Sequence, residues 1–246
     1  MVKRLCLLAI IGALFLLFGC GGGGGSSDTR PTVLFINASA DAGDLDFRLD
    51  DSAFATGLAY TVTNASLSAI DFKGPDVDGW DVSLHTNPGN AEIDRQAIVF
   101  NRDTDNLVIA HGILNYPAGE PLKRLRFNTF TFDRKSPNGN KAKLIVYHGL
   151  ELGAGLTTPQ IVFKSPGQNS LYTTPAIDPG GNAVITVDSG NQTFDVQRQG
   201  TDGVFVTVTQ NLKAGAVYLV LVSGIDQDPV PARQAKVTFI ELPGKL

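Results

Sequence analysis

Short runs of apolar or alternating residues, separated by Gly, Pro, Asn and Asp, follow one another from Pro31 onward. Each run is rich in β-branched or aromatic residues and is bounded by turn formers, which is typical of strands. No window of about twelve or more residues in this part shows a 3.6-residue apolar stripe, so no long helix is expected. The runs that predict strands are residues 32–38, 80–86, 96–100, 107–114, 126–132, 142–148, 182–187, 203–209, 216–224 and 235–242.

Two of these runs also predict which faces are buried. The run GVFVTVTQ (203–210) alternates between apolar and polar residues, which indicates a strand with one wet face. The run AVYLVLV (216–222) is almost continuously apolar, which indicates a strand covered on both faces by its own sheet and a neighbour.

The chain also repeats itself at offsets of 111 to 114 residues, as expected if strands are fixed and loops vary. The offset of 111 aligns residues 33–37 with 144–148, and the offset of 114 aligns Trp80 with Phe194. The ungapped offset of 112 aligns Gly112-Ile113 with Gly224-Ile225, Arg124-Leu125 with Lys236-Val237, and Phe127 with Phe239.

The repeat predicts an all-β chain of two tandem domains, residues 31–134 and 141–244, joined by the polar stretch RKSPNGN at 134–140. Each domain has about 105 residues and roughly seven strand candidates, the size and rhythm of an immunoglobulin-like β-sandwich. The Cys…Trp…Cys core of true immunoglobulin domains is missing, so the prediction concerns architecture only.

The N-terminus predicts export and lipid attachment. Lys3 and Arg4 precede the apolar stretch 5–18, which is shorter than the stretch of about 20 apolar residues that a membrane-spanning helix needs. Leu17-Phe18-Gly19-Cys20 resembles a bacterial lipoprotein processing box, which implies a signal peptide at 1–19 and lipid on Cys20. The alternative is an uncleaved N-terminal anchor helix.

Residues 20–30 then form a Gly/Ser-rich flexible tether, with five consecutive glycines from Gly21 to Gly25. Several acyl chains on one residue give stable anchoring. Because Gly21 is not the aspartate that favours inner-membrane retention, we expect a lipid-anchored envelope protein in the outer membrane, facing the periplasm or the surface.

Composition narrows the function further. The net charge is −4, and loss of the signal with its two basic residues makes the mature chain about −6. Nucleic-acid binding depends on neutralising phosphates with Lys and Arg, so nucleic acid is not expected as a partner. Cys6 would leave with the signal, so the mature chain has neither a disulfide nor a cysteine nucleophile.

The stretch NASADAGDLDFRLDD (37–51) resembles the opening of a bacterial domain-of-unknown-function family, number 4397. Asn37, Ala38, Ser39, Asp41 and Ala42 match its opening motif, and Ala40 stands where the family usually has proline. GWDVSL (79–84) and YLVLVSG (218–224) resemble later elements, while in the second copy His148 fits and residues 149–152 do not. The resemblance implies tandem sandwiches on exported bacterial proteins, and it assigns no activity to this chain.

The acidic stretch DFKGPDVDGWD (71–81) is the best candidate for a cation site. Asp76, Asp78 and Asp81 offer hard oxygen ligands of the kind that calcium prefers, and Gly79 permits a sharp turn. Their spacing does not match the twelve-residue calcium loop, so an ordinary hairpin turn is the favoured alternative. We interpret the acidic runs 41–51 and 101–106 as a wet strand face and a hairpin loop.

No catalytic motif is visible. His85, His111 and His148 lie in no recognisable motif, and we expect His111 and His148 to be hydrogen-bonded structural residues. Trp80 aligns with an aromatic residue in the repeat, which favours a core position over a carbohydrate platform.

The basic cluster LKRLRF (122–127) is expected to turn Lys123 toward water and Leu122, Leu125 and Phe127 toward the core.

The sequence therefore predicts a lipid-anchored, non-enzymatic envelope protein with a binding, adhesion or structural role and no cofactor unless calcium binds. The partner would be an envelope protein or a glycan. The alternatives are an envelope hydrolase (an esterase or glycosidase with dispersed catalytic residues) and a calcium-dependent adhesion module.

Overall fold

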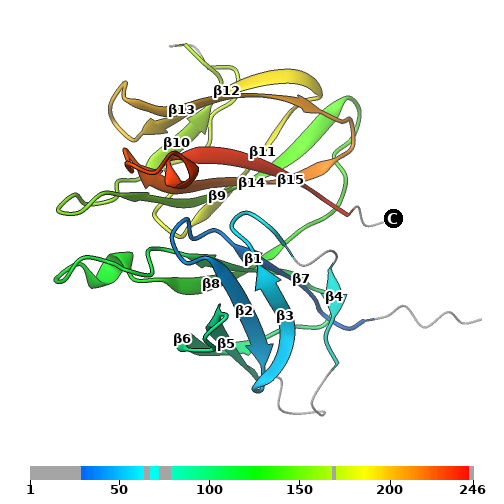
Figure 1. Ribbon diagram of the computed structural model, residues 1–246. Helices are drawn as coiled ribbons and strands as arrows, with labels where there is room; N and C mark the ends of the chain where they lie inside the picture. Colours follow the sequence, from blue (N-terminus) through cyan, green and yellow to red (C-terminus); the bar gives the residue numbers. More distant parts are fainter. Residues whose placement is uncertain (1–28, 64–66, 72–78, 168–169, 244–246) are drawn as a thin grey trace, which may run out of the picture.

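The computed structural model describes residues 29–63, 67–71, 79–167 and 170–243. Within these residues the regular structure consists of β-strands and two short 3₁₀ turns, so the expected all-β fold is confirmed. The strands form two β-sandwiches stacked on one another (Figure 1). In the described part of the chain, no helix combines the length and the apolar character needed to cross a membrane. The predicted signal (1–19), Cys20 and most of the predicted tether lie outside the described residues.

The first sandwich packs two four-stranded sheets around one core. One sheet has the order β4-β1-β7-β8, and the other has the order β3-β2-β5-β6. Phe35, Phe47 and Phe127 fill the space between them and are fully buried. The bounds are β1 (Thr32–Asn37), β2 (Asp44–Leu49), β3 (Ser52–Leu58), β4 (Ser68–Ala69), β5 (Gly79–Asn87), β6 (Glu92–Val99), β7 (Asp105–His111) and β8 (Arg126–Phe132).

The second sandwich repeats this arrangement with one strand fewer. Its sheets have the orders β11-β9-β14-β15 and β10-β12-β13. Phe163 and Phe194 stack in its core at 4.6 Å between ring centres. The bounds are β9 (Lys141–Leu152), β10 (Ile161–Lys164), β11 (Asn182–Asp188), β12 (Gly190–Arg198), β13 (Val204–Leu212), β14 (Val217–Asp226) and β15 (Lys236–Leu242). The division into two domains at 31–134 and 141–244 stays a prediction.

A parallel pair lies at the centre of one sheet in each sandwich: β1 with β7, and β9 with β14. The register places Thr32 beside Asp105 and Lys143 beside Val217, which agrees with the predicted offset of 111 for the first strands. This parallel centre distinguishes the sandwich from a purely antiparallel immunoglobulin sheet.

The offset of 112 does not hold after Gly112 and Gly224. In the pairing with β7 and β14, Ala110 faces Phe127 and Val222 faces Val237. The predicted alignment of Phe127 with Phe239 in the repeat is therefore wrong, and Phe127 corresponds to Val237. The segment after Gly224 is two residues shorter than the segment after Gly112. The 3₁₀ turns η1 (Pro121–Lys123) and η2 (Pro231–Arg233) occupy matching places in these loops.

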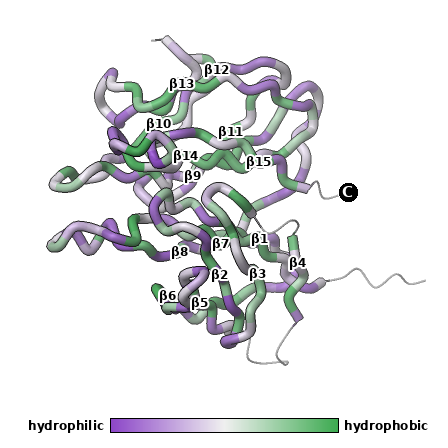
Figure 2. Tube along the Cα trace, in the orientation of Figure 1, coloured by the Kyte–Doolittle hydropathy of each residue, from purple (hydrophilic) through white to green (hydrophobic). Residues whose placement is uncertain are grey.

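A third apolar core joins the sandwiches. Leu34, Ile109, Ile145, Leu219 and Leu221 are buried to within a few per cent and form one cluster with residues from both central sheets. Figure 2 shows the apolar colour along β14, which contributes Leu219 and Leu221 to this core. Burying each large apolar side chain contributes about 1.5–3 kcal/mol. This contact explains the continuous apolar run 216–222, and the predicted burial of that strand on both faces is confirmed.

The acidic run 101–106 is not a hairpin loop as expected. The strand before it, β6, belongs to one sheet of the first sandwich and the strand after it, β7, belongs to the other, so this segment crosses between sheets. Asp105 already lies within β7, where its carboxylate accepts hydrogen bonds from Thr32 Oγ1 at 2.6 Å and Arg134 Nη2 at 2.7 Å. The sequence alone does not distinguish a buried, hydrogen-bonded aspartate from an aspartate in a solvated loop, which explains the error.

Candidate functional site

The motif in the loop after β1 ties neighbouring loops together. Asn37 Nδ2 donates to the carbonyl oxygens of Gly43 at 2.8 Å and Leu58 at 2.9 Å. Ser39 Oγ donates to the carbonyl oxygen of Gly112 at 2.8 Å. Asn37 and Ser39 are almost completely buried, so they brace the fold and offer nothing to a ligand.

His148 takes the place of Asn37 in the second sandwich. Its Nε2 lies 2.9 Å from the carbonyl oxygen of Pro159. Burial lowers the pKa of His148 to about 4, so the ring is neutral at physiological pH and Nε2–H acts as the donor. The expectation of a hydrogen-bonded structural histidine is confirmed here.

His111 departs from that expectation. It is buried, and neither ring nitrogen makes a well-formed hydrogen bond among the described residues. Its polar neighbour is the amide of Asn128, whose Nδ2 donates to the carbonyl oxygen of Gly180 in the second sandwich at 2.8 Å. Burial lowers the pKa of His111 to about 3. The imidazole is therefore a neutral component of the contact between the sandwiches.

A cleft opens where a loop from each sandwich meets the other. One wall is the η1 segment between β7 and β8, and the opposite wall is the loop between β9 and β10; both loops project from the same side of the molecule (Figure 1). The cleft has a volume of about 470 Å³. Its lining is Gly119, Glu120, Pro121, Leu122, Lys123, Arg126, Glu151, Leu156, Thr157, Thr158 and Pro179.

Two leucines form the mouth of the cleft. Leu122 is 80% exposed on one wall and Leu156 is 57% exposed on the other. The sequence expected Leu122 in the core and Lys123 in water, and the structure reverses both. A proline at the start of η1 sets the backbone direction there, so the strand-like alternation does not continue through residues 121–123.

The side chain of Lys123 links the two walls of the cleft. Its side chain is buried, and Nζ donates to the carbonyl oxygen of Gly153 at 2.6 Å and pairs with the carboxylate of Glu120. Glu120 Oε1 in turn accepts a hydrogen bond from Gly155 N at 2.7 Å. These contacts satisfy the buried ammonium group and fix the distance between the loops.

Glu151 supplies an acceptor at the base of the cleft. It is 4% exposed, and burial raises the pKa of its carboxyl above the ordinary range. Thr158 Oγ1 donates to its Oε2 at 2.7 Å, and the charges of Arg126 and Lys123 partly offset the effect of burial. A buried carboxyl beside an apolar mouth is a common composition for a binding pocket.

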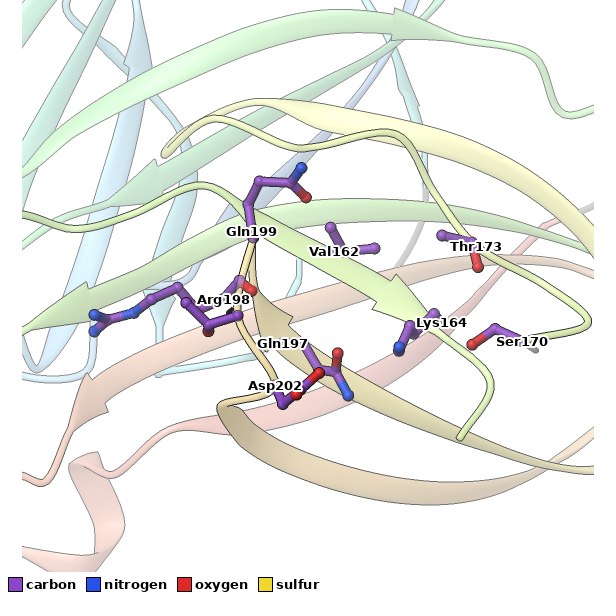
Figure 3. A pocket seen from close by; sticks show the side chains of 10 residues that line it. Val162, Lys164, Ser170, Thr173, Gln197, Arg198, Gln199 and Asp202 are labelled. Atoms are coloured by element: carbon purple, nitrogen blue, oxygen red, sulfur yellow. Dashed lines mark hydrogen bonds between the residues drawn. The ribbon is translucent and has the colours of Figure 1, made fainter. Parts of the chain in front are cut away.

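A second, more polar pocket lies on the second sandwich, between β10, β12 and the turn that follows β12 (Figure 3). Its volume is about 520 Å³, and Lys164, Gln197 and Asp202 are among its lining residues. None of the charged side chains among its described lining residues is buried, and Val162, the apolar side chain in that lining, is not exposed. This pocket therefore offers less to a ligand than the cleft does.

Two serines have polar neighbours of the kind that nucleophilic catalysis uses. Ser83 Oγ lies 2.9 Å from His85 Nε2, and Glu92 Oε2 lies 4.0 Å from that same nitrogen. A catalytic triad needs the serine and the acid on opposite nitrogens of the imidazole. Ser83 is also fully buried, so this arrangement is structural.

The second serine is Ser223 in β14. Its Oγ lies 3.0 Å from the hydroxyl oxygen of Tyr60, and Lys236 lies over the Tyr60 ring. Burial lowers the pKa of Lys236, as an amine base requires, but it raises the pKa of Tyr60, which disfavours the phenolate that a tyrosine base needs. Ser223 is fully buried, however, so a substrate cannot reach its hydroxyl group.

The candidate calcium ligands are only partly described. Asp76 and Asp78 lie outside the described residues. Asp81 accepts a hydrogen bond from Arg95 Nη1 at 2.6 Å, and the same guanidinium bonds Asp51 and Glu92. Among the described residues, no group of three or more His, Cys, Asp or Glu side chains is placed to hold a metal ion. The calcium site stays a prediction.

Trp80 and Phe194 differ in burial although they align in the repeat. Phe194 is fully buried, whereas Trp80 is partly buried and packs against the first core. The sequence missed Glu151 altogether. Its one signal was a charged residue inside the apolar run LIVYHGLEL (144–152), which predicts either a buried partner or a functional group.

Comparisons with known proteins complete the description. No known family profile matches the chain, and no curated protein matches it. Among solved structures, the chain is similar to a protein provisionally named a cell adhesion protein, from Bacteroides ovatus. The identity is 9%, the match covers 89% of this chain and 99% of that one, and the TM-score is 0.25.

A second solved structure is a carbohydrate-binding module of family CBM26 from Eubacterium rectale Amy13K, in complex with maltoheptaose. The identity is 10%, the match covers 87% of this chain and 97% of that one, and the TM-score is 0.25. Likeness at this level identifies neither a ligand nor a partner, so function has to be argued from the chain's own residues.

Proposed function

We propose that this chain is a non-catalytic binding protein of the bacterial cell envelope, tethered to a membrane by lipid on Cys20, and that its ligand occupies the cleft between the sandwiches. The observation that carries the proposal is the combination of Leu122 and Leu156 at the mouth with the buried carboxyl of Glu151 below them. Exposed leucines on two facing loops are costly in water unless a partner covers them.

The chemistry of the lining favours a protein segment over a glycan. Carbohydrate sites rely on aromatic side chains on which sugar rings stack, and none of the described residues that line the cleft is aromatic. Leu122 and Leu156 suit an apolar side chain, and Glu151 suits a hydrogen-bond donor such as a backbone amide. The proposed ligand is therefore a peptide segment with an apolar side chain next to a free N–H group.

The absence of catalysis is proposed on geometric grounds. Ser83 and Ser223, the two serines with histidine, tyrosine or lysine neighbours discussed above, are fully buried. In the cleft, Lys123 is occupied by Glu120 and Gly153, and Glu151 has no nucleophile to activate except the hydroxyl of Thr158, which also accepts a hydrogen bond from Leu152 N at 3.3 Å. These groups hold positions and do not converge on a reacting atom.

The anchor is tested by the mass of the N-terminal peptide of the chain isolated from bacterial membranes. Cleavage before Cys20 and a mass increment of several acyl chains are expected, and Cys20→Ser should release the protein from the membrane fraction. An intact N-terminus with residues 1–19 still attached would contradict the anchor and leave the cleft proposal standing.

The cleft is tested by NMR on the full chain in detergent, with methyl-labelled leucines. N-acetyl-leucine methylamide should shift the methyl signals of Leu122 and Leu156, whereas N-acetyl-glycine methylamide should not. Glu151→Ala should weaken the leucine probe about tenfold through loss of a charged acceptor. Leu171, 74% exposed outside the cleft, is the matched control. Equal shifts at Leu171, or none at either cleft leucine, would overturn the proposal.

A further inference from the structure

The strand β13 forms a free edge of the second sandwich. It ends the sheet β10-β12-β13 and pairs only with β12, so in the described part of the chain the other side of its backbone is hydrogen-bonded to no strand. Its sequence VFVTVTQNL contains no charged residue and no proline. Edge strands usually carry such residues, because an unpaired row of N–H and C=O groups otherwise invites another strand.

The matching edge of the first sandwich is protected. Ala97 of β6 faces Asp81 as Thr207 of β13 faces Asp195, so the two strands occupy equivalent positions. The strand β6 carries Glu92, Asp94 and Arg95. Its Asp94 and Gln96 side chains reach the neighbouring edge strand β8, where Asp94 Oδ2 accepts from Phe127 N at 3.2 Å and Gln96 Nε2 donates to Phe127 O at 2.8 Å.

The second sandwich lacks this protection. Val206 stands where β6 has Gln96, and among the described residues no side chain bonds the backbone of Val237, the counterpart of Phe127. Phe127 is fully buried, whereas Val237 and Phe239 are only partly buried. Among the described residues, the side of the sandwich between β13 and β15 therefore lacks the side-chain bridges of the first sandwich and is partly apolar.

We propose that β13 pairs antiparallel with β13 of a second copy of this chain. An incoming strand must place apolar side chains toward the core and neutral polar side chains toward water. The strand β13 has this pattern itself: Val206 and Val208 face the buried residues Val196 and Phe194, while Thr207 and Thr209 are exposed. Two uncharged copies also meet without like-charge repulsion, which would penalise a pairing between charged strands.

The side chains indicate the register. A two-fold axis at Val208 places Thr207 of each copy opposite Thr209 of the other. Thr209 Oγ1 already lies 2.8 Å from Thr193 Oγ1, and Thr207 Oγ1 donates to Asp195 Oδ1 at 2.6 Å. The pairing would extend these cross-strand hydroxyl rows through one continuous six-stranded sheet, and such threonine pairs stabilise antiparallel strands.

Sedimentation equilibrium of the full chain in mild detergent tests the proposal. The parent chain should show a monomer–dimer equilibrium, and the double variant Thr207→Lys/Thr209→Lys should raise the dissociation constant at least about tenfold by opposing like charges. The matched control is Ala97→Lys/Val99→Lys on β6, which should dimerise like the parent. A strictly monomeric parent, or equal effects of the two double variants, would overturn the proposal.

Disulfide trapping tests the register without relying on the lysine variants. Two differently tagged full-length copies, one with Thr207→Cys and one with Thr209→Cys, are expressed together and oxidised in membranes. A mixed disulfide dimer is expected, while the parent chain, whose only cysteines are Cys6 and Cys20, should give none at this site. Cross-linking to a different protein, or no cross-link in any combination, would show that a second copy does not occupy this edge.

Discussion

The ammonium group of Lys236 lies 3.9 Å from the centre of the Tyr60 ring, and this contact joins the two sandwiches. Tyr60 belongs to the loop after β3, and Lys236 begins β15 directly opposite Ser223 of β14. The Tyr60 hydroxyl also meets Ser223 Oγ at 3.0 Å. One aromatic side chain thus combines a cation–π contact with a hydrogen bond at the edge of the shared apolar core.

Substitution of Tyr60 should separate these two contributions. Tyr60→Phe keeps the ring and loses the hydrogen bond, so it should reduce the free energy of unfolding by about 1 kcal/mol. Tyr60→Leu also removes the cation–π contact and should cost roughly 1 kcal/mol more. Urea denaturation of the full chain measures both values. Equal losses for the two variants would show that Lys236 contributes nothing through the ring.

Two glycines at equivalent positions, Gly112 directly after β7 and Gly224 within β14, should be intolerant of a side chain. Gly224 has φ +105°, and a Cβ there would lie 2.3 Å from the carbonyl oxygen of Gln234; Gly112 has φ +100° and would place a Cβ 2.6 Å from the carbonyl oxygen of Arg124. Each change to alanine should cost roughly 2–4 kcal/mol. Gly79→Ala, where a Cβ meets no atom of the described residues within 4 Å, is the control, and a similar loss there would contradict the steric explanation.

The strands of both sandwiches were predictable where local pattern and burial agree. Residues 126–132 form β8 as predicted from end to end, and the alternation of β13 matches its one wet face. The missed strands β3 and β12 are rich in small or polar residues, as in GNQTFDVQR, and gain their strand conformation from neighbouring strands. The missed strand β10 (IVFK) is apolar but only four residues long. A short stretch of sequence does not contain these contacts with neighbouring strands.

The cleft was much less predictable. The alternation of the sequence predicts Leu122 in the core and Lys123 in water, and the structure shows the reverse. The carbonyl oxygen of Gly153 and the carboxylate of Glu120 bind the ammonium group of Lys123 and hold it in the interior. The Gly153 contact comes from the second sandwich, thirty residues away in the sequence. The burial of Glu151 likewise depends on how the loops of the two sandwiches meet. The sequence of one repeat therefore does not predict this site.

The buried histidines should make the protein acid-sensitive. Burial lowers the pKa of His111 to about 3 and the pKa of His148 to about 4. Below about pH 6.5, these two histidines are therefore protonated in the unfolded chain while they stay neutral in the folded chain. Stability should therefore fall as the pH drops, by about 2 kcal/mol per histidine between pH 7 and pH 5.

The His111→Gln/His148→Gln double variant tests this relation. Its absolute stability can be lower at every pH, and the prediction concerns the slope: the decline in unfolding free energy between pH 7 and pH 5 should be smaller than in the parent by the sum of the two contributions. Urea titrations at several pH values give this slope. An unchanged slope would mean that both imidazoles can be protonated within the folded protein.

Glu151 should show the opposite dependence on pH. Because burial raises the pKa of its carboxyl, ionisation costs more in the folded state than in the unfolded state, and this cost appears only above the unfolded pKa of about 4.3. Glu151→Gln keeps an acceptor for Thr158 Oγ1 and removes the charge. The variant should gain on the order of 1 kcal/mol at pH 8, with the gain vanishing near pH 4.

Glu120 on the opposite wall is the control of opposite sign. The hydrogen bond from Lys123 and the backbone N–H of Gly155 lower the pKa of the Glu120 carboxyl, so its ionised form stabilises the fold at neutral pH and that contribution is lost as the pH falls. Glu120→Gln should therefore lower the melting temperature at pH 8, where Glu151→Gln raises it. A stabilising effect of both variants would mean that loss of negative charge anywhere in the cleft is favourable. Opposite effects would show that Glu151 is kept at an energetic cost, as expected for a group that a ligand uses.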